Sequence, residues 1–293
     1  MSTHPLVSIV VPAYNHEHLV EECLRSVAAQ QWPELELIVI DDVSRDGTLA
    51  RAQRLAAEPD FLARFQGRVR VERNPENLGA HATLNRGIAL AAGEYIGILN
   101  SDDRYAASRI ATLLPRLEAG AMLVFSAARM IDRLGNDITS AEFFALRLSH
   151  SQRGIHSYPS LGFALLRENV ALTTGNLFFR RTLFERVGGF RPLLYCHDWD
   201  FLLRSLLVCE PVFVEQALYE YRIHETNSFH GLSRVAVAET EAVLTAYFSQ
   251  IQRGSFENAL APSPGNWPGL FESMLTALHL RKHWDQARRC AVD

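Results

Sequence analysis

The sequence has few cysteines, and their spacing indicates neither a bound metal nor a redox centre. Its 293 residues include four of them, Cys23, Cys196, Cys209 and Cys290. They lie far apart, and the chain has no C-x-x-C pair of the kind that builds zinc sites and dithiol redox centres. We therefore expect reduced thiols in a cytoplasmic protein.

Long hydrophobic runs and long basic runs are also absent. No window approaches the roughly 18 consecutive apolar residues that a membrane-spanning helix needs. Residues 1–5 lack a basic region, and the apolar run after them stops at Pro12, which argues against a signal peptide. The formal net charge is -4, which does not favour a nucleic-acid binder. Any membrane contact is expected to be peripheral, at the inner face.

A glycine-rich dinucleotide loop is the third absence, because no G-x-G-x-x-G follows a predicted strand. This disfavours an NAD- or FAD-dependent oxidoreductase. Strand and helix patterns nevertheless alternate over the first hundred residues, which predicts an α/β fold with a mostly parallel central sheet flanked by helices. The predicted strands are 6–11, 35–40, 68–72 and the apolar run after Gly93, and the predicted helices are 17–30, 48–57 and 80–92.

Two residues are expected to end elements of this half. Pro12 should terminate the first strand, because its ring cannot continue a central ladder. Gly93 should end the preceding helix as a C′ glycine. After Arg104 the alternation loosens. We predict helices at 107–118, 183–187 and 199–208, strands at 122–127, 172–180 and 212–223, a hairpin at 132–137, and helices from 232 onward, the last two near 269–280 and 284–290.

Acidic residues follow two of the predicted strands. Asp41 and Asp42 come after the second strand, and Asn100-Ser101-Asp102-Asp103 comes after the run that begins at Gly93. Open α/β sheets bind ligands at the carboxyl ends of their strands. An ionised carboxylate accepts hydrogen bonds from a ribose hydroxyl or a base N–H, and Mg²⁺ or Mn²⁺ takes oxygen ligands. The alternative is that both groups only cap the helices that follow.

Two later segments also carry candidate functional side chains. Cys196-His197-Asp198-Trp199-Asp200 precedes an amphipathic helix, and a carboxylate beside an imidazole and an indole suits a general base, because partial burial raises its pKa. Tyr221-Arg222-Ile223-His224 ends a predicted strand, and its arginine and histidine suit phosphate oxygens or a metal. The alternatives are helix capping for the first segment and a solvated surface for the second.

Taken together and in this order, these segments resemble the family-2 glycosyltransferases, inverting nucleotide-sugar transferases with the GT-A fold. Val10-Val11-Pro12-Ala13-Tyr14-Asn15 is similar to the opening strand and nucleotide loop of the family, residues 40–48 to its second acidic segment, and residues 74–87 to its Asn/Gly-rich helix entry. Asn100-Ser101-Asp102-Asp103 occupies the place of the D-x-D metal motif. Gly188-Gly189-Phe190 followed by residues 197–200 looks like the segment with the catalytic base. The resemblance covers about residues 6–230.

Three departures from the family pattern bear on the site. Asn100 stands where the first aspartate of D-x-D is usual, so metal binding would rest mainly on Asp102. His197 replaces a common glutamate ahead of the presumed base, and Val43 stands where glycine is usual. None of these changes removes Asp102 or Asp198.

The resemblance implies transfer of a sugar from a UDP- or dTDP-sugar to a hydroxyl of a saccharide or lipid-linked acceptor, in bacterial surface polysaccharide assembly. It assigns Asp198 as the catalytic base, with Asp102 and His224 as ligands of Mg²⁺ or Mn²⁺. The nucleotide sugar is expected to contact Pro12, Ala13, Tyr14, Asn15, Asp41, Asn77, Asn100, Ser101 and Arg222. The alternative is a non-catalytic nucleotide-sugar-binding or assembly module, which Asn100 and His197 favour.

The expected organisation is one GT-A domain with a helical C-terminal extension. Residues 1–105 are expected to bind the nucleotide sugar, 106–230 the acceptor, and 231–293 form the extension. The extension is expected to cover the acceptor site, to mediate homodimerisation or to lie against a membrane that carries a lipid-linked acceptor. Its basic and aromatic cluster, Arg281-Lys282-His283-Trp284 with Arg288-Arg289, is of the kind found at membrane interfaces, and the alternative is a solvated helix face.

Overall fold

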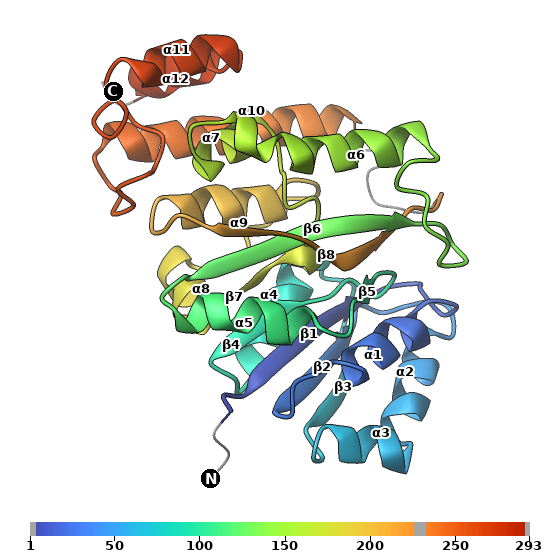
Figure 1. Cartoon of the computed structure of the whole chain (residues 1–293). Helices are drawn as coiled ribbons and strands as arrows, with labels where there is room; N and C mark the ends of the chain where they lie inside the picture. The colour runs from blue at the N-terminus through green and yellow to red at the C-terminus, as the bar shows by residue number, and fades with distance from the viewer. Residues whose placement is uncertain (1–3, 226–232, 291–293) are drawn as a thin grey trace.

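The strands form one mixed sheet with helices on both faces, in a computed structural model that describes residues 4–225 and 233–290 (Figure 1). Over those residues the strand order is β3-β2-β1-β4-β7-β6-β8-β5. The strands are β1 (Val7–Ala13), β2 (Leu35–Asp41), β3 (Val69–Arg73), β4 (Tyr95–Ile98), β5 (Arg104–Tyr105), β6 (Leu123–Ile131), β7 (Phe178–Arg180) and β8 (Val212–Arg222). The α-helices are α1 (Val20–Ala28), α2 (Thr48–Ala56), α3 (Pro59–Arg64), α4 (Ala80–Leu90), α5 (Arg109–Glu118), α6 (Phe143–Arg153), α7 (Leu161–Arg167), α8 (Arg181–Val187), α9 (His197–Leu206), α10 (Ser233–Gln252), α11 (Leu270–Ala277) and α12 (Arg281–Cys290).

The first half of the sheet is parallel, as the sequence predicts. β1 pairs in parallel with β2 on one side and with β4 on the other, and β2 pairs in parallel with β3. Successive side chains of a strand face opposite sides of the sheet. Val10 and Ile40 therefore pack in the core that contains Leu84 of α4, whereas Ile9 and Val39 pack in the core on the α1 side. The shared direction brings the carboxyl ends of β1, β2 and β4 to one edge.

The second half returns the chain to that same edge. β7 is antiparallel to both β4 and β6, and β6 is parallel to β8. The short strand β5, directly after the acidic segment of β4, pairs with β8 through Arg104 and Glu220. The last residues of β8 therefore lie beside Asp102 and Asp103.

The C-terminal helices pack on the side of the molecule away from the N-terminus (Figure 1). α10 contacts α9 and α12. The ring of Trp284 lies 5.7 Å from that of Phe248 and 5.1 Å from that of Phe271, measured between centroids. These rings belong to the same buried core as residues of α4 and α9. Among the described residues, no helix is long and apolar enough to cross a bilayer.

Pro12 does not end β1, contrary to the sequence prediction. β1 continues to Ala13, and Pro12 stands opposite Ile40 of β2. On the other side of β1 the ladder with β4 ends with Val10 opposite Ile98, after which the N–H of Leu99 donates to the carbonyl of Val10. Pro12 has the same orientation as Val10, two residues away, so its missing N–H falls where β4 no longer runs beside it. A proline is tolerated in a strand at such a position.

Gly93 is not the C′ residue of α4, so that prediction is also wrong. α4 ends at Leu90, and the next residue, Ala91, is already extended. A Cβ at position 93 would lie 2.7 Å from both the carbonyl oxygen of Leu6 and the hydroxyl of Ser8. Glycine is required there because the chain crosses close to the start of β1.

The middle of the chain holds more helix than the sequence predicts. α6 and α7 lie in the segment 138–170 and α3 lies in the segment 58–67, and no element was predicted in either segment. The strand predicted over 172–180 is confirmed only for Phe178–Arg180, because residues 174–176 form a 3₁₀ turn. The hairpin turn at 132–137 is confirmed by an antiparallel bridge between Ile131 and Asp137. Position 232, where a helix was predicted to begin, lies outside the described residues.

Candidate active site

The loop after β1 is tied to the loop after β2. This loop contains Tyr14, whose side chain is 39% exposed, and Asn15, whose backbone has a φ of +54°. The N–H of Asn15 donates to the hydroxyl of Ser44, and its side-chain oxygen accepts from the N–H of Arg45, at 3.0 and 2.8 Å. Asparagine is one of the few residues that tolerate a left-handed backbone, so Asn15 both turns the chain and fastens it.

Asp41 and Asp42, although adjacent, are bonded very differently. Asp42 accepts hydrogen bonds from the side chain of Asn74 and from the N–H groups of Leu78 and Gly79, at 2.7–2.9 Å. Asp41 accepts one from the N–H of Ser44 through Oδ2, while its buried Oδ1 has no hydrogen-bond partner among the described residues. Asp42 is therefore a structural carboxylate, whereas Asp41 has one oxygen whose capacity to accept a hydrogen bond is not used by the described residues.

Two other predicted residues of this segment hold the loop. The side-chain amide of Asn77 donates to the backbone oxygen of Asp42 at 2.9 Å. Val43 has a φ of +63°, a left-handed conformation that costs a β-branched residue free energy. A glycine would adopt this conformation freely, but with valine there Asp41 and Asp42 still make the hydrogen bonds described above.

Asp102 and Asp103 also divide into one ligand-like and one structural carboxylate. Asp103 accepts hydrogen bonds from the hydroxyl of Tyr219, the N–H of Arg222 and the amide of Asn100, at 2.5, 2.7 and 3.2 Å. Burial, followed by the charge of Asp102, raises the pKa of Asp103 well above its usual range. Because Tyr219 and Arg222 belong to β8, the hydrogen bonds of Asp103 hold β8 against the acidic loop.

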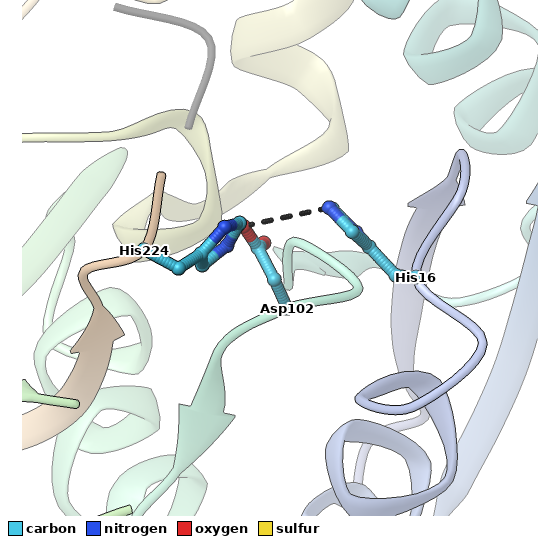
Figure 2. Close-up of side chains that lie close together, drawn as sticks. All are labelled: His16, Asp102 and His224. Carbon is cyan, nitrogen blue, oxygen red and sulfur yellow. Dashed lines mark hydrogen bonds and ion pairs between the residues drawn. The ribbon is translucent and has the colours of Figure 1, made fainter. Parts of the chain in front are cut away.

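The side chain of Asp102 faces two imidazoles (Figure 2). The Nε2 atoms of His224 and His16 lie 2.9 and 3.8 Å from its Oδ2. Burial pushes the pKa of Asp102 upward, but the hydrogen bond from His224 and the positive charge of His16 outweigh it and lower the pKa. One donor atom from each residue lies within 4.8 Å of the others, an arrangement that could hold a metal ion. These donors, two nitrogens and a carboxylate oxygen, are common ligands of divalent transition metals.

His16 is the functional candidate that the sequence analysis missed. Its Nδ1 lies 2.8 Å from the hydroxyl of Ser101, which connects the loop after β1 to the loop after β4. A single histidine in a polar loop carries no pattern of its own. The available signal was its position directly after Asn15, in a loop already assigned to the nucleotide.

Arg222 lies behind the acidic loop, fully buried. Its Nε donates to the backbone oxygen of Asp102 at 2.7 Å, and its terminal nitrogens donate to Glu22 and to the backbone oxygens of Asp132 and Arg133. The guanidinium therefore fixes the loop that carries Asp102. The contact with the nucleotide sugar that the sequence predicts for Arg222 stays a prediction.

Asp198 lies in the first turn of α9, half-buried. Its Oδ1 accepts a hydrogen bond from the N–H of Trp199 at 2.7 Å, and its Oδ2 accepts one from the side chain of Asn169 at 2.9 Å. Trp199 is held in turn by a hydrogen bond to the backbone oxygen of Leu165. Burial raises the pKa of Asp198, and the charge of His197 only partly opposes it. A carboxylate with a raised pKa is a better proton acceptor than an ordinary aspartate.

Side chains between the acidic loop and α9 link Asp102 to Asp198. Asn100 donates to the hydroxyl of Thr173 at 2.6 Å, and the hydroxyl of Thr174 lies 3.1 Å from Nε2 of His197. The pKa of Tyr221 is raised by burial and then by the charges of Asp103, Asp102 and Asp198. Together with the contacts of Asn15 and His16, these interactions connect the three acidic segments through a chain of neighbouring side chains.

The chain is similar to known glycosyltransferases. A family profile described as Glycosyl transferase family 2 matches residues 8–188. An uncharacterised glycosyltransferase of Rickettsia typhi is 28% identical over 85% of this chain and 73% of its own length. A succinoglycan biosynthesis protein of Rhizobium meliloti is 31% identical over 83% of this chain and 69% of its own length. The GalNAc(5)-diNAcBac-PP-undecaprenol beta-1,3-glucosyltransferase of Campylobacter jejuni is 30% identical over 45% of this chain and 40% of its own length.

Solved structures share the fold at lower identity. TarS of S. aureus, in complex with UDP-GlcNAc, has a TM-score of 0.62 at 18% identity, over 96% of this chain and 79% of TarS. The mannosyltransferase PcManGT of Pyrobaculum calidifontis, in complex with GDP-Man and Mn²⁺, also has a TM-score of 0.62 at 19% identity, over 98% of this chain and 74% of that protein. The likeness confirms the predicted GT-A fold.

Proposed function

The chain belongs to glycosyl transferase family 2, and we propose from that premise that it transfers a sugar from a UDP- or dTDP-sugar to an acceptor hydroxyl, with inversion at the anomeric carbon. The observation that supports the proposal is the chain of contacts that connects the segments of Asp41, Asp102 and Asp198. Each has its own chemical environment, and each suits a different part of such a reaction.

The nucleoside is assigned to the loops after β1 and β2. The unpartnered Oδ1 of Asp41 is a charged acceptor, and uracil and thymine present a ring N–H that can donate to it. The exposed ring of Tyr14 offers a surface for the base. Pro12, Ala13, Asn15 and Asn77 shape these loops, and we assign Asn100 and Ser101, at the end of β4, to the ribose.

Asp102 and His224 are assigned as ligands of a divalent metal, Mg²⁺ or Mn²⁺. Their donor atoms lie 2.9 Å apart and come from two segments that Arg222 and Asp103 lock together. Such a metal, when bound, neutralises the negative charge that develops on the departing diphosphate. Arg222 is assigned a positioning role, because its contacts are with the loop of Asp102.

Asp198 is assigned as the general base. It accepts the proton of the acceptor hydroxyl as that oxygen forms a bond to the anomeric carbon and the bond to the diphosphate breaks. A single displacement of this kind inverts the anomeric centre. The hydrogen bonds from Trp199 and Asn169 fix the carboxylate, and burial makes it more basic.

The acceptor is proposed to be a saccharide or a lipid-linked saccharide of a surface polysaccharide. Two relatives support this class. One is named for succinoglycan biosynthesis, and the other is named for glucosyl transfer to an undecaprenol-linked saccharide.

The test is replacement of the base in the full chain. We expect Asp198→Asn to lower turnover by about 10²- to 10⁴-fold, the usual contribution of a general base, while UDP affinity in Mn²⁺ stays unchanged. Turnover is measured as release of nucleotide from a panel of UDP- and dTDP-sugars, and affinity by calorimetry. Glu185→Gln, an exposed carboxylate of α8, is the matched control and should retain both.

A parallel loss of UDP affinity and turnover in folded Asp198→Asn would contradict the assignment of the base. If the wild-type protein binds UDP with Mn²⁺ but releases no nucleotide from any donor of the panel, with or without saccharide acceptors, the non-catalytic binding module is the better description.

A further inference from the structure

His16 approaches the same carboxylate oxygen as His224, from a different part of the chain. Both Nε2 atoms are directed at Oδ2 of Asp102, and the two rings are nearly perpendicular, at 87°, with centroids 5.8 Å apart (Figure 2). His224 is within hydrogen-bond distance of this oxygen, whereas His16, at 3.8 Å, is beyond it. The approach of His16 is therefore not explained by a hydrogen bond to Asp102.

The ring of His16 is oriented as ligating imidazoles usually are. A metal-bound histidine has its second ring nitrogen held by a hydrogen-bonding partner, which fixes the ring. Ser101 lies 2.8 Å from Nδ1 of His16, which leaves Nε2 directed at Asp102. The backbone of His16 is fixed as well, because its N–H donates to the hydroxyl of Thr48 at 2.7 Å and its carbonyl accepts from the first turn of α1.

The spacing of the three donor atoms suits a shared ion. Ligands about 2.1 Å from a metal and at right angles to each other lie about 3 Å apart, and opposite ligands about 4.2 Å. The separations of 2.9 and 3.8 Å from Oδ2 of Asp102 fall in that range. The three side chains are 8–20% exposed, so the cluster is partly shielded from water and still accessible to an ion and a ligand.

We propose that His16 is a third protein ligand of the metal and that the resulting set of two imidazoles and one carboxylate makes this site select a transition-metal ion of the Mn²⁺ class over Mg²⁺. The proposal rests on the metal site of the proposed function and extends it. Mg²⁺ takes oxygen ligands almost exclusively, whereas imidazole nitrogen binds transition metals well. A site with oxygen ligands alone would not discriminate in this way.

The experiment uses Mn²⁺ alone with the full chain, so it does not depend on turnover. Electron spin echo envelope modulation of bound Mn²⁺ detects coupling to ligating imidazole nitrogens. We expect couplings from two imidazoles in the wild-type protein and from one in His16→Gln, with Mn²⁺ affinity weakened by at least about 10-fold, the lower end of what loss of a supporting residue costs. The preference for Mn²⁺ over Mg²⁺, measured by competition, should fall in the same variant.

His18→Gln is the matched control, because His18 lies two residues away, is 60% exposed and pairs with Glu17 instead. It should retain both couplings and the wild-type affinity. Coupling to one imidazole in both the wild type and folded His16→Gln, with equal Mn²⁺ affinities, would overturn the role of His16. That result would leave the proposed function standing if the wild-type protein still releases nucleotide from a donor in the presence of Mn²⁺.

Discussion

At the scale of single residues, Asp41 and Asp42 show how hydrogen bonds separate a binding carboxylate from a structural one. In Asp41→Asn, the amide oxygen is expected to keep the hydrogen bond from the N–H of Ser44. The NH₂ group then takes the place of Oδ1, where it cannot accept a hydrogen bond from the N–H of a base. We therefore expect UDP affinity to fall by about 10-fold or more, since a hydrogen bond to a charged group contributes about 1.5–3 kcal/mol. Calorimetry in the presence of Mn²⁺ measures this.

Asp42→Asn is the comparison for that variant. Its carboxylate already accepts three hydrogen bonds, so the NH₂ group must face a donor, and we expect a loss of stability of about 1–3 kcal/mol. If folded Asp42→Asn binds UDP more weakly and Asp41→Asn binds it as the wild type does, then Asp42 is the binding carboxylate and Asp41 the structural one.

The environment of Asp198 predicts the pH dependence of the reaction. Burial raises its pKa above that of an ordinary aspartate, about 3.9. A general base acts in its deprotonated form, so kcat/KM should rise with increasing pH through this raised pKa and level off above it. Kinetics from about pH 4 to 8 test this, with UDP affinity followed over the same range. An acid limb at or below the ordinary aspartate value would argue that Asp198 is not the base.

Some residues of the candidate site could be identified from the sequence and others could not. Asp102 and Asp198 could be found because Asp102 follows a strand and Asp198 lies where an amphipathic helix begins, and both boundaries are visible in the apolar pattern. His16 could not, since its role depends on Ser101 and Asp102, which lie far away along the chain. Arg222 was noticed, but only the structure shows that β8 turns its guanidinium inward.

At the scale of elements, α2 and the loop before it hold His16 in place. Asp46 accepts hydrogen bonds from the N–H and hydroxyl of Thr48 and from the N–H of Glu17. Partial burial pushes the pKa of Asp46 upward, but the hydrogen bonds from Thr48 and Glu17 outweigh it and hold the pKa below its ordinary value. A lowered pKa in the folded state means that ionised Asp46 stabilises the fold.

We therefore expect Asp46→Ala to lower the free energy of unfolding by about 1 kcal/mol at pH 7, because its hydrogen bonds with Thr48 and Glu17 are lost. The stabilisation is present above the unfolded pKa of about 3.9 and is lost as the pH falls through the lower folded value. Urea unfolding at pH 7 and near pH 3 should show the difference between variant and wild type shrinking at the lower pH. An equal difference at both values would exclude the ionised carboxylate as its source.

The order of elements was more predictable than their ends. The alternation of apolar runs with amphipathic segments predicted the parallel half of the sheet. Both faces of that half are buried, so its strands are visible in the sequence as continuous apolar runs. The errors at Pro12 and Gly93 arose from neighbours in space: β4 ends before Pro12, and Ser8 lies close to Gly93. No local pattern reports such contacts.

At the scale of the whole molecule, one continuous sheet joins the first hundred residues to the rest of the chain. β7 and β6 extend the sheet from β4, and β8 brings His224 back to the end of β4, so the region around Asp102 is assembled from both halves. We propose that residues 1–105 bind the nucleotide sugar and that residues 106–230 bind the acceptor. α10, in the C-terminal extension, packs against α9, the helix that carries Asp198.

The central claim is that Asp41, Asp102 and Asp198 serve one ligand. Its most direct test is a crystal structure of the protein with UDP and Mn²⁺, in which anomalous scattering locates the metal. We predict one nucleotide, with uracil facing Oδ1 of Asp41, manganese on Asp102 and His224, and the terminal phosphate directed toward Asp198. A nucleotide bound away from Asp41, or manganese bound away from Asp102, would contradict the account.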